Sequence, residues 1–152
     1  MTLGTITVSR NQAGLEPIMP YVNTRVDELL GKPLLGDGEC VQIVKMTVPG
    51  LVDIGTMNWK EGEPVLGSKN LQRGTAIATF TKGRFPRQHT GQHAALFLAY
   101  AGATSFYVME QHTRSRRIVS RRIRIPLHGN RRADGTYPQT SNNALAFSVI
   151  EK

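Results

Sequence analysis

The feature that most constrains the fold is a series of short apolar segments in the second half of the chain. Turn residues separate these segments, which lie at 75–80, 93–100, 106–112, 118–125 and 144–150. Their length and spacing predict a meander of antiparallel β-strands. Two stretches with helical spacing of apolar residues precede them, at 23–30 and 39–46. Because helices come before strands instead of alternating with them, the sequence predicts an α+β fold. N-terminal helices would pack on an antiparallel sheet of about five to six strands.

The remainder of the chain shows little periodicity. Residues 1–20 are predicted to form an irregular arm with a short strand near 5–9, and residues 50–74 a loop-rich stretch. A length of 152 residues suits one domain, so we expect a single domain over 1–152. No standard signal peptide and no membrane-spanning run is visible. We therefore expect a protein made in the cytoplasm that does not insert into membranes.

Cys40 is the only cysteine in the sequence, and it follows the turn at 36–38. One cysteine cannot form an internal disulfide, which excludes a disulfide-stapled secreted scaffold. The residue stands on the first turn of the predicted helix 39–46, where unpaired backbone N–H groups and the helix dipole favour the nucleophilic thiolate. The alternative is that Cys40 is a small apolar residue of the core.

A cysteine nucleophile needs a base within hydrogen-bonding reach and a third group that orients the base. The sequence offers four histidines, His89, His93, His112 and His128. His93 is the best candidate because it opens the predicted strand 93–100, and rigid elements hold catalytic groups best. The alternative is a structural histidine bonded to a nearby carbonyl group.

The third group should come from a strand beside His93. Alternation along the predicted strand 106–112 puts Glu110 on an apolar face, where a carboxylate is costly unless it is paired. A contact with His93 would pair this carboxylate, fix the imidazole tautomer and stabilise the imidazolium. Gln111 is the second candidate, although alternation points it to the opposite face.

Three motifs occur in a familiar order. They are Gly-Glu-Cys-Val-Gln-Ile-Val at 38–44, Gly-Thr-Ala-Ile-Ala-Thr-Phe at 74–80 and Gly-Gln-His-Ala-Ala-Leu-Phe-Leu at 91–98. Together they resemble the papain-like cell-wall amidases of the NlpC and CHAP groups, which have a Cys-containing helix, a Gly-x-x-Ile or Gly-x-x-Val strand and a Gly-His-Val-Ala-like strand. The resemblance covers 36–125. It is greatest to small single-domain bacterial amidases, several of which are toxins that type VI secretion systems inject into competing cells.

This resemblance implies a papain-like fold and a Cys-His-acid site that hydrolyses amide bonds in peptidoglycan peptides. Cys40 would be the nucleophile, His93 the general base and Glu110 the acidic third member. The sequence departs from the pattern at Gln92 and at His112, where an amide is expected. The resemblance also implies secretion by a dedicated system and action in the periplasm of a target cell. A periplasmic immunity protein would then protect the producing cell.

Three residues outside these motifs are candidates for substrate binding. Trp59 lies in the loop-rich stretch, and Arg84 and Phe85 lie in the turn that follows the predicted strand 75–80. Together they could form the walls of a groove. The alternative for Trp59 is that its ring pins the loop onto the core.

The positive charge of the chain is concentrated at its C-terminal end. The net charge is +8, and residues 113–152 contain nine Lys or Arg residues against two acidic residues. The six arginines between Arg114 and Arg124 suit an anionic partner such as a cell-wall polymer, although arginines also protect exposed strand edges. A nucleic-acid-binding module is one alternative, but aromatic residues make up only 7% of the chain and Cys40 would have no role.

Two further alternatives concern the chemistry. A papain-like thiol peptidase or acyltransferase with a substrate outside the cell wall would use the same catalytic residues. A metal site could use Cys40, His89, His93 and His112, but no pair of ligands has the usual spacing relative to the thiol. We therefore predict no metal and no other cofactor.

Overall fold

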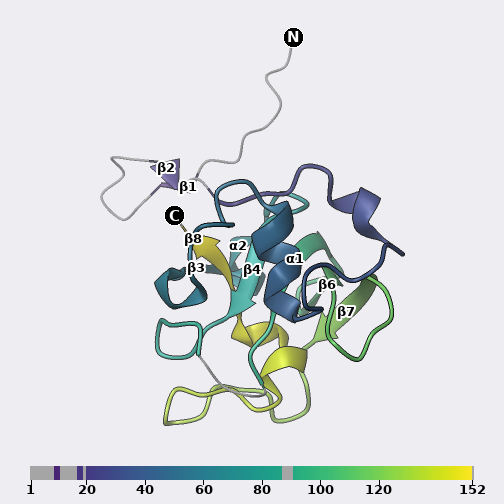
Figure 1. The fold of residues 1–152 in the computed structure, drawn as a ribbon. Helices are drawn as coiled ribbons and strands as arrows, with labels where there is room; N and C mark the ends of the chain where they lie inside the picture. Colours follow the sequence, from purple (N-terminus) through teal and green to yellow (C-terminus); the bar gives the residue numbers. More distant parts are fainter. Residues whose placement is uncertain (1–8, 11–16, 19, 87–90, 152) are drawn as a thin grey trace.

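The computed structural model describes residues 9–10, 17–18, 20–86 and 91–151. In this part of the chain a six-stranded sheet has the strand order β3-β8-β4-β5-β6-β7, and all neighbouring strands are antiparallel. The strands are β3 (Lys60–Pro64), β4 (Ala76–Thr79), β5 (Ala94–Tyr100), β6 (Ser105–Glu110), β7 (Val119–Arg124) and β8 (Phe147–Glu151). Helix α1 (Cys40–Thr47) lies across this sheet (Figure 1). The predicted α+β architecture is confirmed.

Each of the five predicted apolar segments forms a strand, but the meander is incomplete. Strands β4, β5, β6 and β7 follow one another in the sheet, whereas β8 returns to pair with both β3 and β4. β3 was not among the predicted strands because Lys60–Pro64 is mostly exposed and contains a glycine and a proline. It is an edge strand whose pairing with β8 is irregular between Glu61 and Pro64, which is where proline is tolerated.

Of the two predicted helices, the one over 39–46 is present and the one over 23–30 is not. α1 begins one residue later than expected and ends at Thr47. In place of the helix predicted over 23–30 there is only the 3₁₀ turn η1 (Val26–Leu29). The Asn23 side chain accepts a hydrogen bond from the backbone N–H of Arg25, which favours a turn over a continued helix. Unpredicted short elements are η2 (Thr56–Asn58), α2 (Val65–Ser68), η3 (Thr140–Asn142) and η4 (Ala144–Ala146).

The N-terminal arm contributes a two-stranded ladder, β1 (Ser9–Arg10) with β2 (Pro17–Ile18). Most of the strand predicted near 5–9 lies outside the described residues. After the arm, the backbone of Asn23 crosses Gly74 so closely that a Cβ at residue 74 would lie 2.0 Å from the Asn23 carbonyl oxygen. With φ at +94°, Gly74 is a position where only glycine fits.

Two apolar clusters cover the two faces of the sheet. On one face, Ile43 and Val44 of α1 pack with Leu96 of β5 and Met109 of β6. On the other face lies a second cluster that includes Phe97, Phe106, Val108 and Phe147. A strand buried on both faces has no polar side, which explains why β4 and most of β5 are continuous apolar runs. None of the helices among the described residues is long and apolar enough to cross a membrane.

Candidate active site

Cys40 is the first residue of α1, and the loop before it is fixed by hydrogen bonds to the end of β6. The Gln111 side chain, which is fully buried, donates to the carbonyl oxygens of Leu35 (2.9 Å) and Glu39 (3.0 Å) and accepts from the N–H of Leu35 (2.8 Å). Asp37 accepts from the Glu39 N–H at 2.9 Å within the same turn. The half-buried thiol therefore stands at the end of a fixed loop.

The partners of Cys40 come from one face of three adjacent strands. In the register of β5, β6 and β7, Leu96 lies opposite Met109 and Val108 lies opposite Arg121. Because side chains alternate between faces, this register places His93, Glu110 and Arg121 on the same side of the sheet as diagonal neighbours. The register thus brings together a histidine just before β5, the carboxylate at the end of β6 and a guanidinium within β7.

His93 and Glu110 form a buried ion pair. Their exposed fractions are 6% and 2%, and His93 Nε2 lies 2.7 Å from Glu110 Oε1. Burial by itself lowers the pKa of His93, but hydrogen bonds with Cys40 and Glu110 outweigh it and raise that pKa from 6.5 to about 9. Since Nε2 is bonded to Glu110, Nδ1 is the ring nitrogen available to the thiol.

Arg121 is the second hydrogen-bonding partner of the Glu110 carboxylate. Its Nε donates to Glu110 Oε2 at 2.6 Å and its Nη2 donates to Oε1 at 3.0 Å. Burial favours the neutral acid, but the hydrogen bonds from His93 and Arg121 outweigh it and lower the pKa of Glu110 from 4.5 to about 2. Glu110 is therefore ionised at every pH at which the protein is expected to work.

A pocket of about 480 Å³ opens over these side chains. Cys40, His93 and Glu110 line it together with Arg121, and Ser141 and Asn142 of η3 form part of its wall. A thiol, a histidine that holds a proton and an ionised carboxylate in one pocket are the components of a thiolate–imidazolium nucleophile. Cys40 lines this pocket, whose volume is large enough for a substrate amide group.

The two candidates for the third group lie in different places. Glu110 bonds His93, whereas the hydrogen bonds of Gln111 go to the loop before Cys40. No role for Arg121 was predicted from the sequence. This residue is one of the six arginines between Arg114 and Arg124, and nothing in that segment was used to separate it from the others. The period-2 alternation could have identified it, because Arg121 is two residues before Ile123 on the face that this buried residue shares.

The residues predicted to bind substrate lie elsewhere. Trp59 and Phe85 are 4% and 6% exposed, and their ring centroids lie 4.9 Å apart in the core cluster beneath α1. Arg84 is exposed and pairs with Thr81 in a tight turn. The described residues that line the pocket include none of the three. The position of Trp59 agrees with the alternative that its ring anchors the loop on the core.

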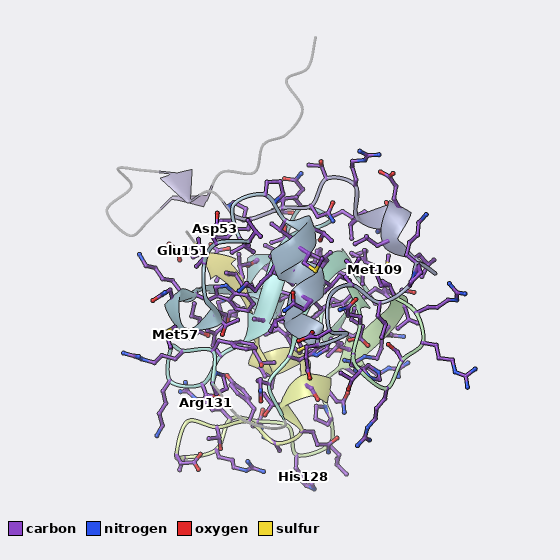
Figure 2. The ribbon with its side chains drawn as sticks, in the orientation of Figure 1. Asp53, Met57, Met109, His128, Arg131 and Glu151 are labelled. Atoms are coloured by element: carbon purple, nitrogen blue, oxygen red, sulfur yellow. The ribbon has the colours of Figure 1, made fainter. Side chains whose placement is uncertain are left out.

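Of the other three histidines in the sequence, the structure places one at the pocket and one away from it. His112 lines the pocket, and its Nδ1 accepts from the N–H of Arg114 at 3.2 Å. His128 is exposed on the long loop at the bottom of Figure 2, away from Met109 on β6. His89 lies outside the described residues. Among those described, no group of three or more His, Cys, Asp or Glu residues is placed to hold a metal ion.

Comparison with known proteins decides the family. The model of the family "Domesticated amidase effector 2" matches residues 20–138. The chain belongs to this family. It is 36% identical over 138 residues to the type VI secretion amidase effector 2 protein of Salmonella typhi, an alignment that covers 88% of this chain and all of that protein. It also resembles the solved structure of type 6 secretion amidase effector 2, with a TM-score of 0.80 and 34% identity over 88% of this chain and 95% of that one.

Membership in this amidase effector family confirms the resemblance found in the sequence and, with it, the papain-like fold. Both relatives are named as amidase effectors of type VI secretion systems, and the matched region contains Cys40, His93, Glu110 and Arg121. The chain is therefore an enzyme of the amidase class.

Proposed function

We propose that this amidase effector cleaves amide bonds in peptidoglycan peptides by cysteine catalysis, with Cys40 as nucleophile, His93 as general acid and base, and Glu110 as the group that orients His93. The observation that carries the proposal is the buried 2.7 Å contact between His93 and Glu110 beside Cys40 in one pocket. The family relationship supports the amidase class, and the names of the relatives support an antibacterial role.

In the first half of the reaction the Cys40 thiolate attacks the carbonyl carbon of the substrate amide. A C–S bond forms, and the carbonyl oxygen becomes an oxyanion, for which the backbone N–H of Cys40 is the first donor. The imidazolium of His93 then gives its proton to the leaving nitrogen, the C–N bond breaks, and an amine departs. A thioester with Cys40 remains.

In the second half a water molecule replaces the amine. His93, now neutral, takes a proton from this water while the oxygen attacks the thioester carbon. A C–O bond forms, the C–S bond breaks, and the product leaves as a carboxylic acid. Cys40 is again a thiolate and His93 again an imidazolium, so the charged pair is restored. Throughout, Glu110 keeps Nε2 of His93 fixed and Nδ1 turned toward the sulfur.

The biological setting follows from the family as a proposal. An effector of a type VI secretion system leaves the producing cell and acts on the wall of a competitor, so the substrate would be met in the periplasm of the target cell. The producer would then need an inhibitor in its own periplasm. We propose a small immunity protein in this role, and its binding to this amidase would block the Cys40 pocket.

Digestion of purified peptidoglycan tests the function. Wild-type protein and Cys40→Ala are incubated with sacculi, and the released muropeptides are identified by mass spectrometry. We expect new peptide fragments with the wild type and none with Cys40→Ala, whose circular dichroism and melting temperature should match the wild type. Undigested sacculi together with cleavage of a non-wall peptide by the wild type would instead favour the thiol peptidase alternative. Full activity of Cys40→Ala would contradict cysteine catalysis.

A further inference from the structure

The side chain that orients His93 is a full negative charge in a buried place, and this creates a problem for catalysis. A base in this reaction must hold a proton, release it to the leaving amine and take another from water. An unshielded carboxylate 2.7 Å from Nε2 binds the imidazolium so strongly that release of the proton becomes unfavourable. Glu110 therefore needs a second partner that reduces its pull on His93.

Arg121 has the geometry of that partner. Its guanidinium grips both oxygens of Glu110, at 2.6 Å and 3.0 Å, in the two-point arrangement that favours an arginine over a lysine. The same guanidinium is fixed from the other side, because Nη1 donates to Asn142 Oδ1 at 2.7 Å and Nη2 donates to the Ser141 carbonyl at 3.0 Å. Its side chain is only 31% exposed, against 3% for Glu110. Solvent therefore screens the pair weakly.

The surroundings of His93 contain few other charges. The charged or titratable groups that line the pocket with it, among the described residues, are Glu39, Cys40, Glu110, His112, Arg114 and Arg121. Of these, Glu39, His112 and Arg114 are exposed, so water and salt screen them. Phe147 packs on the ring edge-on, with centroids 6.2 Å apart, and carries no charge. Besides its burial, the groups that act directly on the proton affinity of His93 are thus Cys40 and Glu110, and Arg121 contacts Glu110.

On this basis, and resting on the proposed function, we propose that Arg121 is a positioning residue for the amidase reaction, which holds Glu110 in place and neutralises enough of its charge for His93 to release a proton. With Arg121 bound, Glu110 still stabilises the imidazolium, but less strongly than an isolated buried carboxylate would. A buried ionised acid is tolerated because it is paired and fully hydrogen-bonded.

The next arginine along β7 provides a matched control. Arg122 faces the opposite side of the sheet, is exposed, and donates to Ser105 Oγ at 3.0 Å without contacting a carboxylate among the described residues. A methionine at either position removes the charge and keeps most of the apolar stem. Asn142→Ala is a second control, because it removes one tie between Arg121 and the pocket wall without changing a charge.

The experiment is the pH profile of kcat and kcat/KM on a soluble peptidoglycan peptide. For Arg121→Met we expect kcat to fall about 10- to 100-fold, as for groups that support a catalytic residue through hydrogen bonds. The alkaline limb of the kcat/KM profile should move to higher pH by about one unit. The reason is that loss of a nearby positive charge lets Glu110 stabilise the protonated form of His93 more strongly. Arg121→Lys should keep the limb near its original place, and Arg122→Met should match the wild type in kcat and in the limb.

A double-mutant comparison isolates the mechanism. With Glu110→Gln already present, there is no carboxylate charge to neutralise, so adding Arg121→Met should cause no further upward movement of the limb. A fall in kcat for Arg121→Met without movement of the limb would overturn the proposal and leave Arg121 a structural residue. If Asn142→Ala gave the pH profile that is expected for Arg121→Met, the proposal would also be overturned, because the effect would then come from the pocket wall. Failure of the proposed function is distinguishable, since Cys40→Ala would then remain active.

Discussion

Glu110 and Gln111 are adjacent in the chain and both buried, yet they serve opposite halves of the candidate site. Glu110 holds His93 through charges, with Arg121 on its other side. Gln111 holds the backbone of the loop before Cys40 through neutral hydrogen bonds. The contacts that hold the base therefore involve charged groups and depend on pH, whereas the Gln111 contacts that hold the loop before Cys40 are between neutral groups. A cysteine enzyme needs the sulfur in a constant place and a base whose proton can move.

The largest effect should come from removing the charge on the base side. Glu110→Gln keeps an acceptor for His93 but loses the full negative charge, so the imidazolium is less stabilised. We expect kcat to fall about 100-fold, within the range measured for loss of general acid–base assistance. The alkaline limb of kcat/KM, expected near the His93 pKa of about 9, should move to lower pH. An unchanged limb would show that Glu110 does not set the charge of His93.

Removing the amide on the nucleophile side should lower stability more than it changes chemistry. Gln111→Leu leaves the N–H of Leu35 and the carbonyls of Leu35 and Glu39 without their side-chain partner. We expect a loss of about 2 to 3 kcal/mol in the free energy of unfolding, measured by urea denaturation. Activity should fall about 10-fold because the start of α1 is less well positioned. The comparison between the two residues fails if the alkaline limb moves as it does in Glu110→Gln.

The pH dependence of stability separates the two halves further. The pKa of Glu110 is lowered from 4.5 in the unfolded chain to about 2 in the folded protein. The stabilisation that its ionised form gives to the folded protein is therefore fully present above pH 4.5 and is lost as the pH falls toward 2. The stability difference between wild type and Glu110→Gln should therefore shrink by about 3 kcal/mol between pH 5 and pH 2, since each pKa unit corresponds to about 1.4 kcal/mol. The difference between wild type and Gln111→Leu should stay nearly constant over the same interval. A constant difference for Glu110→Gln would show that the carboxylate is not stabilised by folding.

The smallest effect should come from the exposed arginines. Arg116 and Arg124 contact no carboxylate among the described residues and lie in the strongly basic segment. The double variant Arg116→Gln/Arg124→Gln should bind intact sacculi about threefold more weakly at low salt, since exposed charges each contribute little. Turnover of a soluble peptide should be unchanged. Lys60→Gln, which removes a charge from the opposite edge of the sheet, is the control, and equal weakening by it would show that only net charge matters.

The prediction of the fold succeeded where one strand carries its own signal and was incomplete where pairing decides. β5 and β6 are apolar runs bounded by turn residues, so their segments were evident. β3 has no apolar pattern and is a strand only because β8 pairs with it. The place of β8 between β3 and β4 was equally invisible, because strand order depends on contacts between residues that are far apart in the chain.

For the site, the sequence determined which chemistry was available: one thiol after a glycine turn, a histidine at the start of an apolar strand and an acid at the end of the next. Only the tertiary structure decided that Glu110 bonds His93 while Gln111 bonds the loop before Cys40, and that Arg121 alone among the neighbouring arginines grips the acid. The reason is physical. Residue type and local spacing fix what a side chain can do, whereas the partner that it meets depends on the register of three strands and on the path of a loop, which no local signal encodes.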